Sequence, residues 1–332
     1  KVGTGGGTAE RLTSHPGMEQ YPALSPDGST IAFAAEYEGP VELYTMPVTG
    51  GLPTRHTFDG TEPRVSGWTP DGRILYRTTR YSTLPASQLM RLDPKSGVRE
   101  AVPLAQGSEG TYEPKGQTLY FTRFPRQGSS TKRYEGGWIE NLWRYTAGEP
   151  EAKPLSADYK GTSRNPMWWE GRLYFLSDRD GTMNLWSMAP DGTDLRQHSH
   201  HTGFDIHTAS LNRGRVVYSR AGDLHLLDLS SGSDTVLNIT LASDLDQQRE
   251  RWIKRPLDYL TSAHISPNGD RLALTARGQV FVTTTEPGRL VEIPRPAGVR
   301  QRAASFLPDG RQLLALSDAS GELEFWKFPA NG

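Results

Sequence analysis

The side chains best suited to binding chemistry in this sequence are basic, and they concentrate around two segments, Phe124–Glu140 and Ser243–Pro256. Guanidinium and ammonium groups gathered in this way can hold carboxylates or attract acidic ligands through a focused field. Each segment also contains Asp or Glu, so the alternative is a solvated loop whose charges pair with one another. The candidate ligand-binding residues are Arg126, Lys132, Arg133, Arg251, Lys254 and Arg255.

Other reactive residue types occur without a pattern that completes a site. His198, His200 and His201, with His207 nearby, could ligate zinc or copper, but no Asp, Glu or Cys is placed to complete the ligand set. We interpret these histidines as part of a polar connector. The sequence has no cysteine and no G-x-S-x-G motif, so neither a thiol nor a serine nucleophile is indicated. We therefore predict no catalytic residue, no metal and no cofactor for this chain.

Composition argues against some classes of partner. Lys and Arg number 37 against 38 for Asp and Glu, whereas a nucleic-acid-binding domain normally carries a basic excess. No apolar run approaches the roughly 18 residues that a membrane span requires. The sequence starts at Lys1 without a signal peptide, so we expect a processed product or an excised piece, and favour the latter. The compartment is left open, with the cytoplasm favoured over the periplasm or export.

One pattern recurs seven times along the chain, and such a repeat decides the fold. Each copy has a short apolar strand, a turn rich in Pro, Asp and Gly, a β-prone strand, a loop, and an aromatic strand before another Gly turn. Gly suits the first turn because a tight hairpin usually needs a positive φ that a Cβ penalises. The turn glycines span 282 residues in six steps, a mean of 47, which matches propeller blades of about 40–50 residues. They are Gly28, Gly72, Gly116, Gly171, Gly214, Gly269 and Gly310.

This repeat predicts an all-β fold, a β-propeller of four-stranded antiparallel blades. A single sheet of alternating strands has two apolar faces and cannot bury both alone, whereas stacking neighbouring sheets around an axis buries them. We favour one seven-bladed domain over residues 1–332, in which Glu10–Thr13 completes the last blade as its outermost strand. The alternative is a six-bladed propeller over residues 8–298, with residues 299–332 starting a second propeller.

Longer stretches carry a family resemblance. The repeat SPDG-x-x-IAF, with a later LY or LW before a Gly turn, resembles the repeats of TolB-type and tricorn-type propellers. RYEGGWIENLW (Arg133–Trp143), the blade sequence Leu173–Asp205 and ARGQVFV (Ala276–Val282) resemble successive segments of tricorn protease. These matches keep their order and spacing across most of the chain. Glu135 departs from the family pattern, which usually has Arg there, and this argues against an anion-binding role for that segment.

The resemblance implies a propeller region of a large, self-compartmentalising serine peptidase, acting as a channel, filter or docking platform for peptides. The family's catalytic Ser, His and Glu lie in later domains, so the resemblance implies a non-catalytic chain. Its partners would be peptides and other domains of the parent protein, which would also bring any homo-oligomerisation. Two alternatives stay open: a free-standing TolB-like interaction propeller, and a propeller enzyme such as a lyase, lactonase or glycosidase. For the enzyme, only His207 and His264 fall near inner strands.

Overall fold

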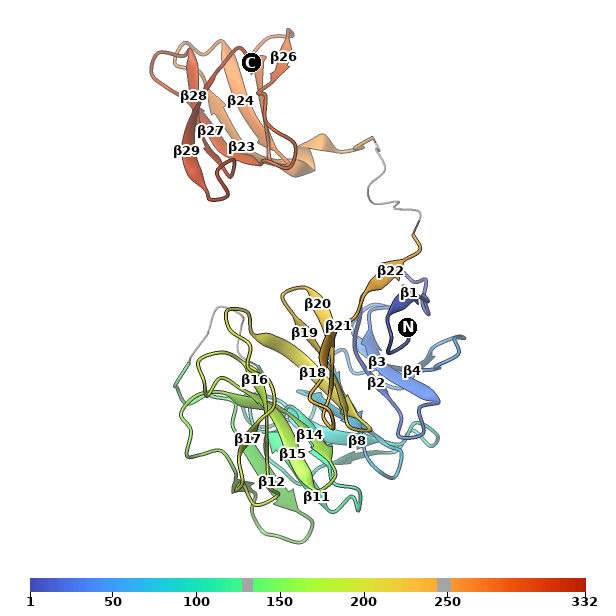
Figure 1. Ribbon diagram of the computed structural model, residues 1–332. Helices are drawn as coiled ribbons and strands as arrows, with labels where there is room; N and C mark the ends of the chain where they lie inside the picture. Colours follow the sequence, from blue (N-terminus) through green and yellow to red (C-terminus); the bar gives the residue numbers. More distant parts are fainter. Residues whose placement is uncertain (127–133, 244–251) are drawn as a thin grey trace. The chain divides into compact units, whose positions relative to one another are not determined.

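The computed structural model describes residues 1–126, 134–243 and 252–332, and it divides into two compact units (Figure 1). Unit 1 is Lys1–Ala242 and unit 2 is Ser243–Gly332, and each is described by itself. The described ranges contain no α-helix, although Pro256–Tyr259 forms a short 3-10 helix. No helix in these ranges is long and apolar enough to cross a membrane.

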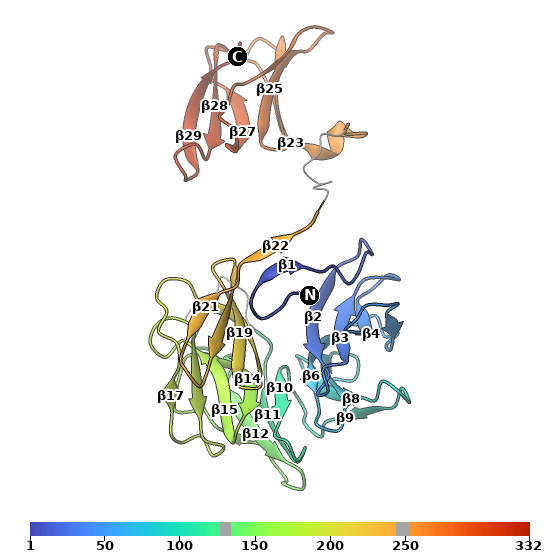
Figure 2. The same cartoon turned by 45° about the vertical axis from the view of Figure 1, so that its right-hand side comes forward.

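Unit 1 contains five four-stranded antiparallel sheets, and in each sheet the strands lie side by side in chain order, as the repeat predicts. Figure 2 shows these sheets following one another along an arc. The strands, sheet by sheet, are β2 (Glu19–Leu24), β3 (Thr30–Ala35), β4 (Glu42–Pro47) and β5 (Thr54–Arg55); β6 (Arg64–Trp68), β7 (Ile74–Thr78), β8 (Gln88–Leu92) and β9 (Arg99–Ala101); β10 (Gly110–Tyr112), β11 (Thr118–Thr122), β12 (Leu142–Thr146) and β13 (Lys153–Pro154); β14 (Ser163–Trp169), β15 (Arg172–Ser177), β16 (Asn184–Met188) and β17 (Arg196–Gln197); and β18 (Ile206–Asn212), β19 (Arg215–Arg220), β20 (Asp223–Asp228) and β21 (Asp234–Val236).

Unit 2 contains two further antiparallel sheets, one of four strands and one of three. The all-β fold and the repeat of small antiparallel sheets are therefore confirmed, while closure into one ring of seven or into six plus one stays a prediction. The strands of unit 2 are β23 (Leu260–Ile265), β24 (Arg271–Ala276), β25 (Gln279–Thr284) and β26 (Leu290–Glu292); and β27 (Gln301–Phe306), β28 (Gln312–Ser317) and β29 (Glu324–Pro329).

The turn between the first two strands of each sheet has the predicted chemistry. All seven turn glycines have a φ between 63° and 82°, a region that side chains with a Cβ disfavour. In the first copy, Asp27 braces the turn by accepting hydrogen bonds from the Ser25 hydroxyl at 2.5 Å and from the Ser29 amide at 3.0 Å. These bonds, that of Ser25 first, lower the pKa of the Asp27 carboxyl to about 2. The turn is thus fixed by local sequence alone.

The core lies between neighbouring sheets. Each of four apolar clusters in unit 1 draws its side chains from two consecutive sheets. Between the third and fourth sheets, for example, Tyr120 stacks on Trp168 with ring centroids 5.1 Å apart, and Leu142 meets Phe175. Trp169 packs against the next cluster along. These tryptophans serve packing, which is the role expected of aromatic residues in blade strands.

The first strand of each sheet in unit 1 is its inner strand, a name used below for β2, β6, β10, β14 and β18. Consecutive inner strands lie in contact with one another. Four of them, all except β10, contain a register shift of the β-bulge type. A bulge inserts an unpaired residue and re-aims the neighbouring side chains. The inner strands β2 and β18 are mostly exposed, whereas the second strands β3 and β15 are mostly buried.

The N-terminal segment forms a strand pairing that the sequence did not suggest. Glu10–Thr13, expected to complete the last sheet, is not in a strand, and the described sheet of β27, β28 and β29 has three strands. Instead β1 (Gly7–Ala9) pairs in parallel with β22 (Ile239–Leu241), next to the end of unit 1. Completion of the last sheet by Glu10–Thr13 stays a prediction. Within unit 1, backbone pairing joins β1 to β22, and the hydroxyls of Thr8 and Thr240, 232 residues apart in the sequence, lie 3.1 Å apart.

The two basic insertions also differ in their setting. Phe124–Glu140 separates the second and third strands of one sheet, as expected, because it joins β11 to β12. Ser243–Pro256 does not lie within a sheet, since it falls between β22 and β23, at the division between the two units. Only the first insertion therefore belongs to the body that contains the inner strands.

Truncation of a residue between sheets tests this account of the core. Leu89 is fully buried among Leu75, Leu119 and Phe121, so Leu89→Ala should lower the free energy of unfolding by about 2–5 kcal/mol. Leu52, 91% exposed, provides the matched control, and Leu52→Ala should change it by less than about 0.5 kcal/mol. Urea unfolding followed by tryptophan fluorescence measures both, and equal effects of the two variants would contradict the packing described.

Candidate functional site

A hollow of about 480 Å³ opens on unit 1 beside the inner strand β6. Its size falls within the range of about 300–1,000 Å³ that is usual for small-ligand sites. The connector after β5, strands β6 and β7, the loop before β8 and the loop after β11 all contribute to its wall. We call it the arginine hollow. Its lining residues are Gly60, Thr61, Glu62, Arg64, Arg77, Thr78, Thr79, Ala86, Ser87 and Pro125.

Arg64 and Arg77 are direct cross-strand partners in the antiparallel pair of β6 and β7. Like charges placed directly opposite each other destabilise a sheet. Burial, followed by the charge of Arg64, lowers the pKa of the Arg77 guanidinium. Arg77 donates from Nη1 to the Ser108 hydroxyl, and Arg64 lies 5.1 Å from the ring centroid of Tyr21. The hollow is therefore lined by two cations that oppose each other.

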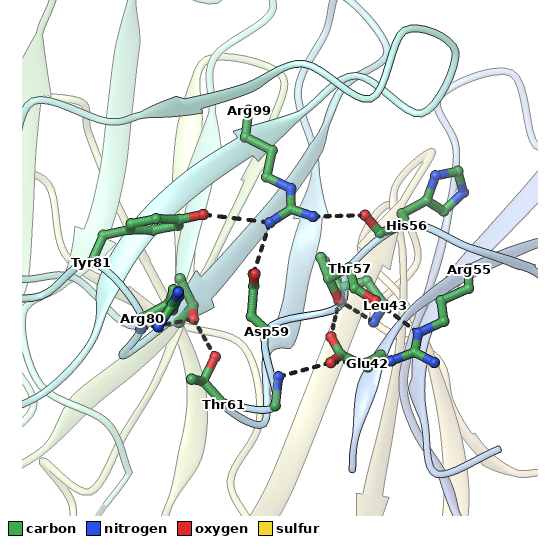
Figure 3. A network of polar contacts seen from close by, with 12 residues as sticks. Glu42, Leu43, Arg55, His56, Thr57, Asp59, Thr61, Arg80, Tyr81 and Arg99 are labelled. Carbon is green, nitrogen blue, oxygen red and sulfur yellow. Dashed lines mark hydrogen bonds and ion pairs between the residues drawn. The ribbon is translucent and has the colours of Figure 1, made fainter. Parts of the chain in front are cut away.

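A buried carboxylate fixes one wall of the hollow (Figure 3). Glu42, on β4, is fully buried and accepts hydrogen bonds from the Thr57 hydroxyl and, at 2.8 Å, from the Gly60 amide. Arg55 reaches the same carboxylate with Nη2 at 3.4 Å. A buried charge is tolerated only when it is paired and hydrogen-bonded, and Glu42 meets both conditions. The loop that carries Gly60 into the hollow is held in place by this network.

A second set of contacts ties the same loop to the next sheet (Figure 3). Arg99 of β9 pairs with Asp59 at 2.8 Å and donates to the carbonyl oxygen of His56 at 3.0 Å. The hydroxyls of Thr61 and Thr78 lie 3.0 Å apart across the hollow's wall. The wall is thus built by residues that are distant in sequence, and it joins the first two sheets of unit 1.

Arg126, the predicted site residue within unit 1, belongs to a second cationic group next to the hollow. It follows Pro125 directly and donates from Nη1 to His207 Nε2 at 2.6 Å. Buried Arg164 donates to the carbonyl oxygen of the same histidine at 2.8 Å, and its Nε lies 3.7 Å from Glu140. Burial, then Arg126 and Arg164, lower the pKa of His207. Because a guanidinium can only donate, His207 Nε2 accepts the hydrogen bond from Arg126.

The other predicted site residues are only partly described. Lys132, Arg133 and Arg251 lie outside the described residues. Lys254 and Arg255 are exposed in unit 2, where Arg255 pairs with Asp258 at 3.2 Å, as expected of a loop whose charges pair with one another. The binding role assigned to all six residues stays a prediction.

The histidine cluster has structural contacts. His198 Nε2 lies 2.8 Å from the Ser187 hydroxyl, and His201 Nε2 lies 2.7 Å from the hydroxyl of Tyr218. In the part of the chain that the structure describes, no group of three or more His, Asp or Glu side chains is placed to hold a metal. The interpretation of these histidines as a polar connector fits these hydrogen bonds.

Sequence reasoning missed Arg64 and Arg77. Counted back from the turn at Gly72 in regular register, Val65 would face Arg77. The shift between Val65 and Gly67 brings Arg64 opposite Arg77 instead. The signal available in the sequence was Gly67 itself, because an isolated glycine within a strand pattern indicates a bulge.

Comparison with known proteins identifies the family and the fold. The model of the family "Tricorn protease N-terminal beta propeller domain" matches residues 1–233. "Tricorn protease homolog 1" of Streptomyces coelicolor is 32% identical, over 98% of this chain and 31% of the relative. "Tricorn protease homolog" of Saccharolobus solfataricus is 30% identical, over 90% of this chain and 28% of the relative. This chain thus spans about a third of the length of these relatives.

Solved structures agree on the fold. The crystal structure of the tricorn protease superposes with a TM-score of 0.72 at 19% identity, covering 96% of this chain and 32% of that one. The structure of a putative TolB from Agrobacterium tumefaciens superposes with a TM-score of 0.55 at 16% identity, over 68% of this chain and 82% of that one. At these identities the likeness shows a β-propeller fold.

Removal of the Glu42 carboxylate tests the wall of the hollow. Glu42→Ala leaves Arg55 and the Gly60 amide without their buried acceptor, so the free energy of unfolding should fall by about 3–5 kcal/mol. Glu38, whose side chain is 68% exposed, also pairs with Arg55, and Glu38→Ala should cost about 0–1 kcal/mol. Thermal or urea unfolding of the two variants compares them, and similar losses would show that the buried network is not what holds the loop.

Titration of His207 tests the second cationic group. Because Arg126 lowers the pKa of His207, Arg126→Ala should raise that pKa, whereas Arg123→Ala, whose guanidinium binds Gln106, should not. The pKa of His207 in the folded state lies below the unfolded value of about 6.5. Its contribution to the free energy of unfolding is therefore fully present above about pH 6.5 and decreases as the pH falls below that value. NMR of the histidine Cε1–H groups measures the pKa, and an unchanged value in Arg126→Ala would contradict the contact.

Proposed function

Because the chain belongs to the family of tricorn protease N-terminal β-propeller domains, we propose that it is a non-catalytic part of a larger serine peptidase, serving as a channel, filter or docking platform for peptides. Two facts support the proposal. The chain spans only about a third of its relatives, so there is room in such proteins for a separate catalytic region. The chemistry on its inner strands is also suited to binding rather than to bond cleavage.

The observation that carries the proposal is the set of side chains presented by the inner strands. Arg64 on β6 and His207 on β18, with its partner Arg126 from the loop after β11, are cationic or neutral hydrogen-bonding groups, and buried Arg164 on β14 supports His207. A hydrolase would need a nucleophile with a base in hydrogen-bonding reach and a third group to orient that base. Guanidinium groups instead recognise the carbonyls and carboxylates of peptides. The inner strands therefore present a peptide-binding surface.

The absence of catalysis is tested by assaying the 332-residue chain on chromogenic peptide substrates, with the longer parent protein as the positive control. We expect hydrolysis by the parent and none by the chain. Hydrolysis by the chain alone, at a rate above that of buffer, would overturn the proposal.

Peptide binding is tested separately by fluorescence anisotropy with a labelled acidic peptide. Charge-based binding should weaken several-fold between 50 mM and 500 mM NaCl, because salt screens exposed charges. Arg126→Ala should weaken it by about three- to tenfold, since a lost charged contact is worth about 1 kcal/mol. Arg289→Ala, at an exposed arginine of unit 2 that forms no ion pair or hydrogen bond among the described residues, is the control. A peptide affinity that changes neither with salt concentration nor with Arg126→Ala would contradict the proposed surface.

A further inference from the structure

Arg64 and Arg77 differ from the well-paired arginines of unit 1. Arg73, Arg99 and Arg172, for example, each have a carboxylate within 2.5–2.8 Å, from Glu100, Asp59 and Asp194 respectively. Among the described residues, Arg64 and Arg77 have no carboxylate within ion-pair distance. Their closest charged neighbour by strand register is each other.

Nearby carboxylates do not compensate for this pair. Glu109 and Glu140 raise the pKa of Arg77 by their charge, but burial and Arg64 outweigh them. Glu109 is already engaged, because its Oε2 accepts a hydrogen bond from the Asn165 amide at 2.7 Å. Like charges directly opposite each other destabilise a sheet, so an anion bound between the two guanidinium groups would stabilise the pair.

The hollow's lining indicates which kind of anion. A volume of about 480 Å³ is many times that of one water molecule, which takes about 30 Å³, so the hollow has room for more than a small inorganic ion. Its wall also contains the Glu62 carboxylate and the hydroxyls of Thr79 and Ser87, which accept hydrogen bonds from N–H groups. A peptide carries a carboxylate together with amide N–H groups that can donate to the Glu62 carboxylate, whereas phosphate offers no N–H group.

We propose that the arginine hollow binds a peptide carboxylate between the guanidinium groups of Arg64 and Arg77. Each guanidinium offers a planar fork that matches the two oxygens of a carboxylate, and the bound anion converts a repulsive pair into two attractive ones. The identification of the ligand as a peptide rests on the proposed function. The arginine pair and its hollow stand independently of it.

Isothermal titration of the full 332-residue chain tests the proposal with matched probes. Acetyl-Ala-Ala-Glu-amide presents a side-chain carboxylate, acetyl-Ala-Ala-Gln with a free C-terminus presents a main-chain carboxylate, and acetyl-Ala-Ala-Gln-amide presents neither. We expect at least one carboxylate peptide to bind at least tenfold more tightly than the amide, and the stronger of the two identifies the source of the carboxylate. Equal affinity for all three peptides overturns the proposal. Inorganic phosphate that binds as tightly as the better peptide also overturns it, in favour of an inorganic anion site.

Substitutions locate the binding. Arg64→Gln and Arg77→Gln should each weaken the better peptide at least tenfold, while Arg289→Gln, which removes one exposed charge from unit 2, should leave the affinity within twofold. Undiminished binding in Arg64→Gln places the peptide elsewhere and overturns the proposal. Arg64→Lys keeps the charge but loses the planar fork, so it should bind with intermediate affinity.

Stability separates a binding role from a structural one. Without peptide, Arg64→Gln relieves the repulsion on Arg77, so its melting temperature should equal or exceed that of the original chain. A lowered melting temperature together with lost binding shows that Arg64 maintains the fold, and overturns the proposal. Two results separate failure of this proposal from failure of the proposed function. Peptide hydrolysis by the chain would contradict the proposed function alone. Peptide binding that depends on Arg126 but not on Arg64 or Arg77 would support the proposed function and exclude the arginine hollow as the site.

Discussion

The structure depends on one constraint: a four-stranded sheet of alternating residues has two apolar faces, and each must be covered by another sheet. In unit 1 four apolar clusters answer this constraint, because each draws on two consecutive sheets, while a fifth on the first sheet packs against Leu12 and Tyr37. Leu89 and Phe175 belong to such clusters and are fully buried. The second and third strands contribute most of this packing, and charged side chains lie mainly on the inner strands and the loops. Arg64 and Arg164 lie on inner strands and Arg126 on a loop, whereas Arg77 lies on the second strand β7, opposite Arg64.

Bulges then decide how the inner strands present their side chains. The shift between Val65 and Gly67 brings Arg64 opposite Arg77, and a shift between Arg164 and Met167 lies beside the arginine that reaches His207. In both places the bulge sits next to the charged group, consistent with the use of bulges to re-aim side chains near functional sites. The packing that closes the sheets and the irregularities that interrupt them thus have separate tasks. The packing holds the fold together, and the bulges arrange the surface that we propose binds peptides.

The sequence predicted the parts of the structure that local chemistry determines. Gly28 and its counterparts marked every first hairpin because a positive φ is a property of the turn itself. Arg126 could be found from the basic composition of its insertion, although its partner His207 lies 81 residues away. The pairing of Arg64 with Arg77 was missed, because one extra residue in β6, marked in the sequence by Gly67, changes which side chains face each other. The pairing of β1 with β22 was equally out of reach, since it joins segments 232 residues apart through backbone pairing and one contact between the hydroxyls of Thr8 and Thr240.

The most direct test of the central claim, that the inner strands of unit 1 form an anion-binding surface, is anomalous diffraction from crystals of the chain soaked with 4-bromobenzoate. The bromine marks the position of a bound carboxylate without reference to activity or to stability. The account predicts a bromine peak in the hollow lined by Gly60, Arg64 and Arg77, with the carboxylate directed at the two guanidinium groups. Bromine peaks confined to other surfaces, with the hollow empty at saturating ligand, would contradict it.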